Sequence, residues 1–501
     1  MKLNDLLAEW ITANDRTRGK EISITGLALD SRKVVEGNLF VALSGTKEHG
    51  LNYAQQALAN GAIAIIYDTN NAAQFPLAQA DASQPFFAIK DLNKLIGFIA
   101  SRFYNNPSQA MNVIGITGTN GKTSCSQFLS QLLPQCGIIG TLGWGAFGQL
   151  EKTTNTTPDA IALQSILADM KEQGKQAIAM EVSSHGIDQG RINGITFKGA
   201  VVTNISRDHL DYHGNMENYL QTKLQLLKKT GLSFVVVNLD NAYQNEVINA
   251  VPKDIPIWGF SCSNNNIITG ETVNGSILGY HSTGIEIEIN WRKQSRSVIV
   301  PLYGDFNIEN ILTVTTILMA MGKDFSESIE KLAYIKPVKG RMESFGGSNS
   351  LPLVFVDYAH TPDALNRVLS SVRKHCNKNL WVVFGCGGNR DIGKRPLMRE
   401  AAEYWADHII ITDDNPRFEN GLTIINDILA GCKSTNIEII QNRQEAIMDV
   451  IARATEKDCI VIAGKGHENY QEINGQYIPF HDQLVVMEAL KNRGFNNANV
   501  A

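Results

Sequence analysis

Residues 113–123, VIGITGTNGKT, have the residue types and spacing of a loop that binds the phosphates of a nucleotide. An apolar stretch runs into a glycine-rich turn, and a helical stretch, SCSQFLSQLL, follows. Glycines let the backbone approach a phosphate, while backbone N–H groups and the helix N-terminus supply positive potential. We expect Lys122 to lie beside the β and γ phosphates and Thr123 to hold magnesium. The rest of the loop is Gly118, Thr119, Asn120 and Gly121.

Polar side chains follow two apolar strands farther along the chain. Glu181 ends the strand AIAMEV, at the edge where a parallel sheet binds ligands, and a carboxylate there suits a magnesium ion. The segment TNISRDHLDYHG follows another apolar strand and crowds several polar groups together: Thr203, Asn204, Asp208, His209 and Asp211. This crowding favours a metal-site role for His209.

A third polar group follows the strand HIIIT in the last third of the chain. It comprises Asp414, Asn415, Pro416 and Arg417, from the sequence DDNPRFEN. An arginine can bind a carboxylate through two parallel hydrogen bonds, a geometry that lysine cannot reproduce. The pattern therefore indicates a site for a ligand that carries a carboxylate.

The elements that must position these residues fall into three predicted domains. A chain of 501 residues is too long for one hydrophobic core. The first domain, residues 1–108, has short strands at 38–43 and 62–67, an amphipathic first helix in MKLNDLLAEWITAND, and a last helix at 91–104. Residues 105–108, Asn-Asn-Pro-Ser, are a plausible linker.

The second predicted domain, residues 109–336, is a parallel sheet that carries the phosphate loop. Its apolar strands MNVIGITG, AIAMEVSS, AVVTNIS and FVVVNLD alternate with helical stretches, which is typical of a parallel sheet covered on both faces. Residues 264–303 alternate polar and apolar types and predict appended β-hairpins. A helix is expected at 307–321.

The third predicted domain, residues 337–501, again alternates strands with helices. Its strands are expected in LPLVFVDYAH, LWVVFGCGG, HIIITDDNP, IEIIQN and DCIVIAGKG. This pattern predicts a doubly wound, Rossmann-like α/β domain. The fold class expected for the whole chain is therefore α/β.

Composition and charge exclude several classes of protein. Hydrophobic residues make up 43% and charged residues 19%, so the chain is expected to fold throughout. The net charge of -5 does not suggest a nucleic-acid or membrane partner. The start lacks the pattern of a secretory signal, and no apolar run is long enough to span a membrane. Seven scattered cysteines without a CxxC pair indicate reduced thiols, so we expect a cytoplasmic protein.

The phosphate loop departs from the general motif, which has glycine where this chain has Ile116. The shorter form GTNGKT resembles the Mur ligase family and its folylpolyglutamate synthase relatives. The resemblance to the Mur ligases covers essentially the whole length. The glutamate before a serine pair, NI-x-x-DHLD, DFNIEN, KGRME and VDYAHTPDAL follow the loop in the family's order.

The resemblance implies a role for each of these motifs in binding ATP and magnesium. Glu181 and His209 would hold magnesium, Asn307, Arg341 and Asp357 would contact ATP, and His360 would lie near the nucleotide. It also implies that Lys223, in NYLQTKLQLL, becomes carbamylated and supplies a carboxylate for a second magnesium ion. From its own segment, Lys223 is predicted to be a lysine on the surface of a helix.

The resemblance further implies two substrates, UDP-N-acetylmuramoyl-L-alanyl-D-glutamate and meso-diaminopimelate, used in peptidoglycan synthesis. The residues implied to hold the first substrate are Ser31, Thr46, His49, Asn155, Thr156, Thr157, Ser183, Gln189 and Arg191. The DNPR form goes with meso-diaminopimelate, whose far end carries a carboxylate. Arg390, Gly464 and Glu468 would also bind this amino acid, Glu468 through its ammonium group. L-Lysine would leave Arg417 buried without a partner, which costs about 1 to 3 kcal/mol.

An amide-bond ligase first uses ATP to convert a carboxylate into an acyl phosphate, which the amine then attacks. This chemistry depends on positioning and on neutralising charge, and it needs no protein nucleophile. The lack of a convincing Ser-His-Asp or Cys-His signature agrees with it. The alternatives are an L-lysine-adding ligase, a folylpolyglutamate synthase-like ligase, and a nucleotide-dependent regulator. We expect a monomer.

Overall fold

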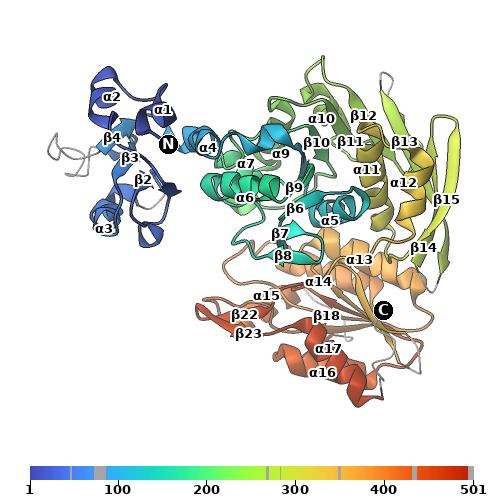
Figure 1. Cartoon of the computed structure of the whole chain (residues 1–501). Coiled ribbons are helices and arrows are strands. Elements are labelled where there is room, and N and C mark those ends of the chain that lie inside the picture. The colour runs from blue at the N-terminus through green and yellow to red at the C-terminus, as the bar shows by residue number, and fades with distance from the viewer. Residues whose placement is uncertain are drawn as a thin grey trace. The chain divides into compact units, whose positions relative to one another are not determined.

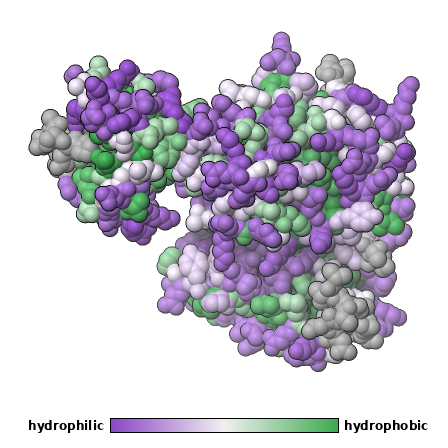
Figure 2. Space-filling model, viewed as in Figure 1, coloured by the Kyte–Doolittle hydropathy of each residue, from purple (hydrophilic) through white to green (hydrophobic). Residues whose placement is uncertain are grey.

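The computed structural model describes residues 1–45, 48–72, 86–266, 270–281, 284–347, 351–430 and 437–494 (Figure 1). The chain divides into two compact units. Unit 1 comprises Met1–Thr117, Leu133–Ala200 and Thr222–Ser233; unit 2 comprises Gly118–Leu132, Val201–Gln221 and Phe234–Ala501. No helix in the described ranges is long and apolar enough to cross a membrane. Hydrophilic residues cover much of the face shown in Figure 2.

The first part of unit 1 is a parallel sheet of four strands in the order β1-β2-β3-β4. Along β2, Leu39 and Val41 face one apolar core while Phe40 and Ala42 face the other, so helices cover both faces. The elements are β1 (Gly26–Ala28), β2 (Asn38–Ala42), β3 (Ala64–Asp68), β4 (Phe86–Ile89), α1 (Leu3–Leu7), α2 (Ala13–Gly19), α3 (Ala54–Ala59) and α4 (Leu92–Phe103).

The predicted first helix is wrong in one respect, because it is broken into α1 and α2. Thr12 has an extended backbone, and its side chain accepts a hydrogen bond from the backbone N–H of Asp15 at 3.2 Å. Such an N-cap satisfies a donor at the start of a new helix. The apolar periodicity of the segment therefore spans two short helices.

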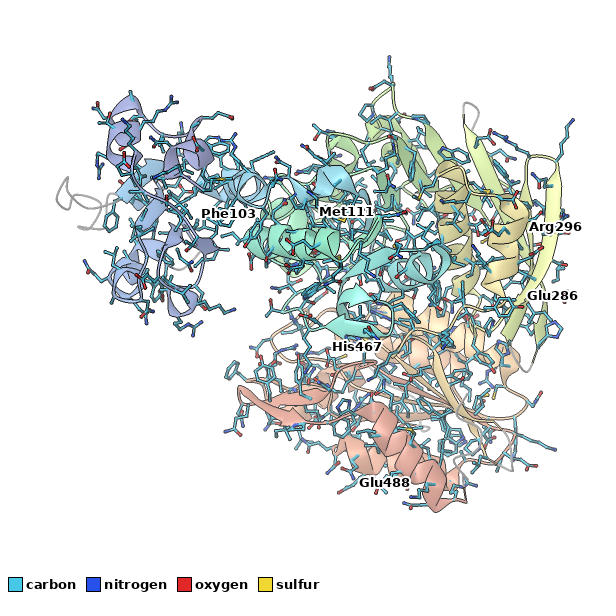
Figure 3. The ribbon with its side chains drawn as sticks, viewed as in Figure 1. Phe103, Met111, Glu286, Arg296, His467 and Glu488 are labelled. Atoms are coloured by element: carbon cyan, nitrogen blue, oxygen red, sulfur yellow. The ribbon has the colours of Figure 1, made fainter. Side chains whose placement is uncertain are left out.

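The second part of unit 1 contains parallel strands in the order β5-β9-β6, followed by antiparallel β7 and β8. Every residue of β9 is buried, as the apolar sequence predicted. The predicted linker, residues 105–108, lies between Phe103 and Met111, which are labelled in Figure 3, and it overlaps a short 3-10 helix at Pro107–Ala110. The elements are β5 (Asn112–Thr117), β6 (Cys136–Gly140), β7 (Gly143–Ala146), β8 (Gln149–Glu151), β9 (Ala177–Glu181), α6 (Ala160–Glu172) and α7 (Ser184–Asp188).

Unit 2 begins with the phosphate loop and contains a mixed sheet. Strands β11, β12 and β13 are parallel, whereas β13, β14 and β15 are antiparallel, so the predicted hairpins are confirmed. Ile285, Ile287 and Ile289 are fully buried and alternate with Glu286 and Glu288. The elements are α5 (Lys122–Leu132), α8 (Leu210–His213), β11 (Phe234–Asn238), α10 (Gln244–Ala250), β12 (Ile257–Ser261), β13 (Glu271–His281), β14 (Gly284–Trp291), β15 (Gln294–Val300), α11 (Phe306–Ala320) and α12 (Phe325–Leu332). Two elements, β10 (Gly199–Val202) and α9 (Met216–Leu224), carry the chain from one unit to the other.

The last part of unit 2 is a sheet in the order β16-β17-β21-β18-β19-β20, parallel except for β16. Separate apolar cores lie on its two faces, which confirms the predicted α/β class. The strands are β16 (Glu343–Gly346), β17 (Leu353–Asp357), β18 (Leu380–Phe384), β19 (His408–Ile411), β20 (Ile437–Ile439), β21 (Cys459–Ala463), β22 (Tyr470–Ile473) and β23 (Gln476–Pro479). The helices are α13 (Pro362–His375), α14 (Lys394–Trp405), α15 (Gly421–Leu429), α16 (Arg443–Arg453) and α17 (Asp482–Asn492).

Candidate active site

The phosphate loop lies between β5 and α5, as predicted, and the segment after β10 fixes it within unit 2. The backbone N–H of Thr119 donates to the carbonyl oxygen of Asn204 at 2.8 Å, and the N–H of Asn120 donates to its Oδ1 at 2.9 Å. The Thr203 hydroxyl donates to the Asn120 carbonyl oxygen at 2.6 Å. Thr203 and Asn204 were predicted only to share a crowded polar segment with His209, and the structure shows that they support the loop.

Lys122 and Thr123 form the first turn of α5, where backbone N–H groups and the helix dipole favour an anion. The Lys122 ammonium donates to the carbonyl oxygens of Gly118 and Thr119, at 2.7 and 2.9 Å. The Thr123 hydroxyl is buried and accepts a hydrogen bond of 3.5 Å from Arg341. A cation, a hydroxyl and a helix N-terminus thus meet at this loop, which can hold phosphate groups.

We expect Gly118→Ala to weaken nucleotide binding more than tenfold. Gly118 has φ +148°, and an added Cβ would lie 1.9 Å from the Thr203 hydroxyl oxygen, so the loop must shift. Isothermal titration with ATP measures the effect. Gly322→Ala is the matched control, because Gly322 also has positive φ, +72°, but an added Cβ meets no atom within 4 Å. Equal affinities for the two variants would contradict the assignment of the loop.

The predicted ATP contacts that follow in the chain lie in unit 2 with the loop. The Asn307 side chain donates to the Tyr303 carbonyl oxygen at 2.7 Å and accepts from Asn310 at 2.9 Å. Asp357, at the end of β17, is buried and accepts from the backbone N–H groups of Met342 and Ala359, at 2.7 and 2.8 Å. Burial raises the pKa of this carboxyl, although the Arg341 charge opposes the rise.

Tyr358 lies at the centre of a group of cationic and imidazole side chains. The Arg341 guanidinium lies over its ring at 4.5 Å, and the rings of His360 and His467 pack against it. Burial and the nearby Lys394 lower the pKa of His360 to about 4. Burial and Arg341 lower the pKa of His467, labelled in Figure 3, to about 3. Both imidazoles are therefore neutral at neutral pH.

We expect His360→Gln to reduce the acid sensitivity of the fold. In the folded protein His360 stays neutral down to about pH 4, whereas in the unfolded chain it takes up a proton near pH 6.5. The stability of the fold is therefore lost as the pH falls through this range. The melting temperature should drop less between pH 7 and pH 5 in the variant than in the unchanged chain. His281→Gln, which changes an exposed histidine of β13, is the control. An equal drop in His360→Gln and the unchanged chain would refute the stated cause.

His209 precedes α8 and has left-handed backbone geometry, with φ 53°. Its Nε2 lies 3.4 Å from Asp208 Oδ2. Burial raises the pKa of the Asp208 carboxyl, but interactions with neighbouring basic groups, His209 first and Lys122 among them, outweigh this effect and lower it. Asp208 is therefore ionised beside the phosphate loop. Within the described part of the chain, no three His, Cys, Asp or Glu side chains gather where they could hold a metal ion.

In unit 1, Glu181 lies at the carboxyl end of β9 and is fully buried. Its carboxylate accepts hydrogen bonds from the backbone N–H and the hydroxyl of Thr141, at 3.0 and 3.1 Å. The Thr141 hydroxyl also lies 3.0 Å from that of Thr156. The sequence interpretation missed Thr141. Its position directly after the buried strand β6 is the signal that could have identified it.

Several residues predicted for the uridine-linked substrate gather around the same strand end. Thr157 is fully buried, donates to the Glu181 carbonyl oxygen at 3.0 Å and accepts from the Ser183 N–H at 2.9 Å. Arg191 donates to the Thr157 carbonyl oxygen at 2.7 Å and pairs with Gln189. Asn155 is exposed in the loop before α6. The structure thus brings two separate predicted motifs together.

The residues predicted earlier in the chain belong to the four-stranded part of unit 1. The Ser31 hydroxyl donates to the Gln56 side chain at 2.7 Å. His49 is buried, with Nε2 at 3.0 Å from the Asp68 carbonyl oxygen and Nδ1 accepting from the Leu51 N–H. Both ring nitrogens therefore hold the fold locally. Thr46 lies outside the described residues.

Three residues predicted for the amino acid, Asp414, Asn415 and Glu468, meet after β19 and β21 in unit 2. Asn415 donates to Glu468 Oε2 at 2.8 Å. The fully buried Lys465 ammonium bridges Asn415 Oδ1 and Glu468 Oε2, at 2.9 and 2.8 Å, and lies 3.7 Å from Asp414. Lys465, which the sequence interpretation missed, neutralises this acidic group. Gly464 comes directly after β21, Pro416 is buried beside Asn415, and Arg390 is exposed in the loop after β18.

Arg417 has a protein partner, which corrects one step of the sequence argument. Its Nε donates to Glu472 at 3.0 Å and its Nη1 to the Gly388 carbonyl oxygen at 2.8 Å. The side chain is 21% exposed. The expectation that L-lysine would leave Arg417 buried without a partner is therefore wrong, because Glu472 already pairs with it.

Lys223 also differs from the expectation based on its segment alone. The sequence predicted a lysine on a helix surface, but Lys223 is only 1% exposed in α9. Lysine is rarely buried to this extent, because removing an ammonium ion from water costs free energy. The position of this lysine thus differs from that of an ordinary surface residue.

Three family models match successive parts of the chain. They are described as "Mur ligase family, catalytic domain" over residues 23–104, "Mur ligase middle domain" over 116–318 and "Mur ligase, glutamate ligase domain" over 340–466. The chain is 42% identical to a UDP-N-acetylmuramoyl-L-alanyl-D-glutamate--2,6-diaminopimelate ligase of Coxiella burnetii, over 97% of this chain and 99% of that protein. A ligase of the same name from Xanthomonas campestris is 43% identical, over 98% of each chain.

Solved structures agree with these similarities. One of a UDP-N-acetylmuramoyl-L-alanyl-D-glutamate--2,6-diaminopimelate ligase has a TM-score of 0.69 and 34% identity, covering 99% of this chain and 100% of that one. A Mycobacterium tuberculosis folylpolyglutamate synthase has a TM-score of 0.61 at 16% identity, covering 81% of this chain and 96% of that one. At that identity the second likeness concerns the fold alone.

Proposed function

The chain belongs to the Mur ligase family, and we propose that it joins meso-diaminopimelate to UDP-N-acetylmuramoyl-L-alanyl-D-glutamate in peptidoglycan precursor synthesis. The family and the enzyme class, an ATP-dependent amide-bond ligase, agree with the sequence prediction. The observation that carries the proposal is the similarity to ligases of that name along 97% of the chain. Within the family, this reaction is that of the branch called MurE.

ATP provides the energy for the amide bond. A carboxylate oxygen of the terminal D-glutamate attacks the γ-phosphorus of ATP, which forms an acyl phosphate and releases ADP. The amine of the amino acid then attacks the acyl carbon, and inorganic phosphate leaves with the bridging oxygen while the amine loses a proton. The groups at the phosphate loop act by position and charge: the Lys122 ammonium and the α5 N-terminus stabilise the negative phosphates. Gly118, Thr119, Asn120 and Gly121 shape the loop.

Other residues are proposed to hold ATP from farther along the chain. Asn307 and Asp357, both buried, are fixed by the hydrogen bonds described above. The Arg341 guanidinium lies over the Tyr358 ring and donates to the Thr123 hydroxyl. His360 is neutral and can donate or accept a hydrogen bond without adding charge. These positions support the ATP contacts that the family resemblance implied.

We also propose Thr123, Glu181, His209 and a carbamylated Lys223 as magnesium ligands, because hydroxyl, carboxylate and carbamate oxygens suit the ion and the family resemblance implies His209. Bound magnesium would neutralise charge on the phosphates. The burial of Glu181 and Lys223 supports the proposal, since an anionic carbamate gains from a nearby cation. Removing carbon dioxide should lower the activity, and bicarbonate should restore it. Lys223→Gln should show no such response, whereas Lys228→Gln, at an exposed position of the same segment, should retain it.

The uridine-linked substrate is proposed to contact Ser31, Thr46, His49, Asn155, Thr156, Thr157, Ser183, Gln189 and Arg191. The meeting of Thr156, Thr157, Ser183 and Arg191 around β9 supports this assignment. The amino acid is proposed to contact Arg390, Asp414, Asn415, Pro416, Arg417, Gly464 and Glu468. To pair with the ammonium group of the amino acid, Glu468 would give up part of its interaction with Lys465.

Domain limits of 1–108, 109–336 and 337–501 are part of the proposal, as is a cytoplasmic monomer without nucleic-acid or membrane partners. The free cysteines among the described residues support a reducing compartment. The four-stranded sheet of residues 26–89 supports a separate N-terminal domain.

Mass spectrometry of the reaction product tests the proposed substrates. The protein is incubated with ATP, the uridine-linked dipeptide and one amino acid at a time: meso-diaminopimelate, L-lysine or L-glutamate. We expect a product only with meso-diaminopimelate, and none without ATP. Preference for L-lysine would support the alternative ligase of the same family. In a parallel reaction with a folate in place of the dipeptide, addition of glutamate to the folate would support the folylpolyglutamate synthase-like reaction.

A further inference from the structure

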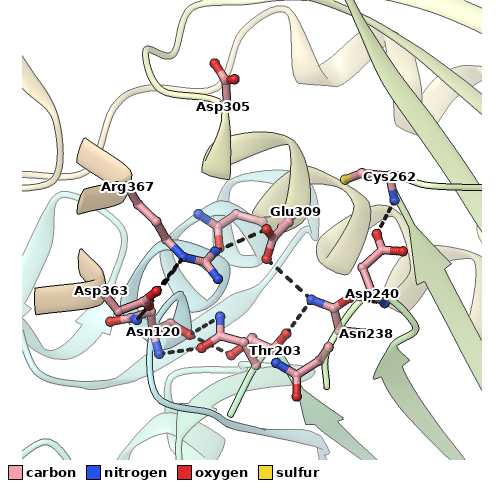
Figure 4. A network of polar contacts seen from close by, with 12 residues as sticks. Asn120, Thr203, Asn238, Asp240, Cys262, Asp305, Glu309, Asp363 and Arg367 are labelled. Carbon is pink, nitrogen blue, oxygen red and sulfur yellow. Dashed lines mark hydrogen bonds and ion pairs between the residues drawn. The ribbon is translucent and has the colours of Figure 1, made fainter. Parts of the chain in front are cut away.

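A closed ring of polar side chains connects the phosphate loop with helices α11 and α13 in unit 2 (Figure 4). The Asn120 side chain donates to Asp363 Oδ2 at 3.2 Å, and Arg367, one turn farther along α13, pairs with Asp363 at 3.3 Å. Arg367 also donates to Glu309 of α11 at 3.1 Å. The loop is thus tied to a residue 243 positions away in the sequence.

The ring closes on the other side of the loop. Asn238, at the end of β11, donates to Glu309 Oε2 at 3.3 Å and to the Thr203 carbonyl oxygen at 2.9 Å. The Thr203 hydroxyl donates to the Asn120 carbonyl oxygen. Asn120 is therefore held through its backbone on one side and through its side chain on the other. Each member has two partners within the ring, so the arrangement specifies one position of the loop.

Arg367 is the only cation among the six ring residues that the structure describes, and it lies between two carboxylates. Without it, Glu309 and Asp363 would face each other without a counter-charge. Burial raises the pKa of Glu309 and the Arg367 charge opposes the rise, which agrees with this role. Arg367 and Glu309 also line a cavity of about 480 Å³, so shortening Arg367 removes little core packing.

We propose that Arg367 is a positioning residue for ATP, which acts through Asp363 and Asn120 to fix the phosphate loop. The loop is then already ordered before the nucleotide arrives, so that binding costs less conformational entropy. This inference rests on the proposed use of ATP, but it does not depend on which amino acid is added.

Arg367→Gln in the full chain tests the proposal. We expect the Kd and the KM for ATP to rise about tenfold, as the loss of hydrogen bonds to charged groups predicts, with kcat changing less than KM. The KM for the uridine-linked dipeptide and the melting temperature should stay near their original values. Arg367→Lys keeps the charge, but a lysine bridges the two carboxylates less well than an arginine. The affinity of this variant for ATP should therefore lie between those of the unchanged chain and of Arg367→Gln.

Arg453→Gln is the matched control. Arg453 also bridges two carboxylates in unit 2, Glu438 and an aspartate one turn earlier, Asp449, but in α16 and away from the ring. Its change should leave the affinity for ATP unaltered. Unchanged ATP affinity in Arg367→Gln would overturn the inference, and so would a general loss of affinity for both substrates with a lower melting temperature. A selective loss of ATP binding would support it even if the proposed amino acid proved wrong.

Discussion

Lys122→Met should reduce kcat/KM for the ligase reaction by about three orders of magnitude. The ammonium is the cation of the phosphate loop, and methionine has a similar length without charge. The Lys122 ammonium donates to two carbonyl oxygens of the loop itself, so replacing it should not unfold the chain. Steady-state phosphate release gives the rate, and circular dichroism checks the fold.

The control for this prediction is Lys331→Met, in α12. Lys331 is exposed and pairs with Glu327 on the same helix, so this change should alter the rate less than twofold. A Lys122→Met protein with near-normal activity would show that phosphate binding occurs elsewhere in the chain.

Arg417→Ala should raise the KM for meso-diaminopimelate about a hundredfold and leave the affinity for ATP nearly unchanged. The Arg417 side chain is 21% exposed, and its guanidinium can still bind a carboxylate while Glu472 holds its Nε. Amino-acid dependence of product formation and titration with ATP measure the two effects separately.

Glu472→Gln separates substrate binding from a purely structural role of Arg417. If the arginine binds the substrate carboxylate, removing the competing charge of Glu472 should leave the KM unchanged or lower it. If Arg417 only anchors β22 through Glu472, both variants should raise the KM equally, and that result would refute the assignment.

Strand ends could be predicted well from the sequence, because buried parallel strands are apolar along their whole length. The apolar run before Glu181 ends where strand β9 ends, and the apolar run before Asp414 ends shortly after strand β19. Polar residues at those ends were therefore placed correctly on the sheet edges. The order of the motifs then indicated the family.

Pairings between distant residues could not be predicted, because no local pattern records them. Glu472 pairs with Arg417 across 55 positions, and Glu309 pairs with Arg367 across 58. The burial of Lys223 was missed for the same reason, since its helix reads as amphipathic and only tertiary packing covers the ammonium. Buried polar groups of this kind depend on the whole fold.

The acyl phosphate is the central claim, and the path of one oxygen atom tests it directly. The uridine-linked dipeptide is prepared with heavy oxygen in the carboxylates of its D-glutamate, and the released phosphate is examined by mass spectrometry. We predict one heavy oxygen in the phosphate formed together with the meso-diaminopimelate product. Phosphate without the label, released at the same rate whether or not the two substrates are present, would identify a nucleotide-hydrolysing regulator and contradict the account.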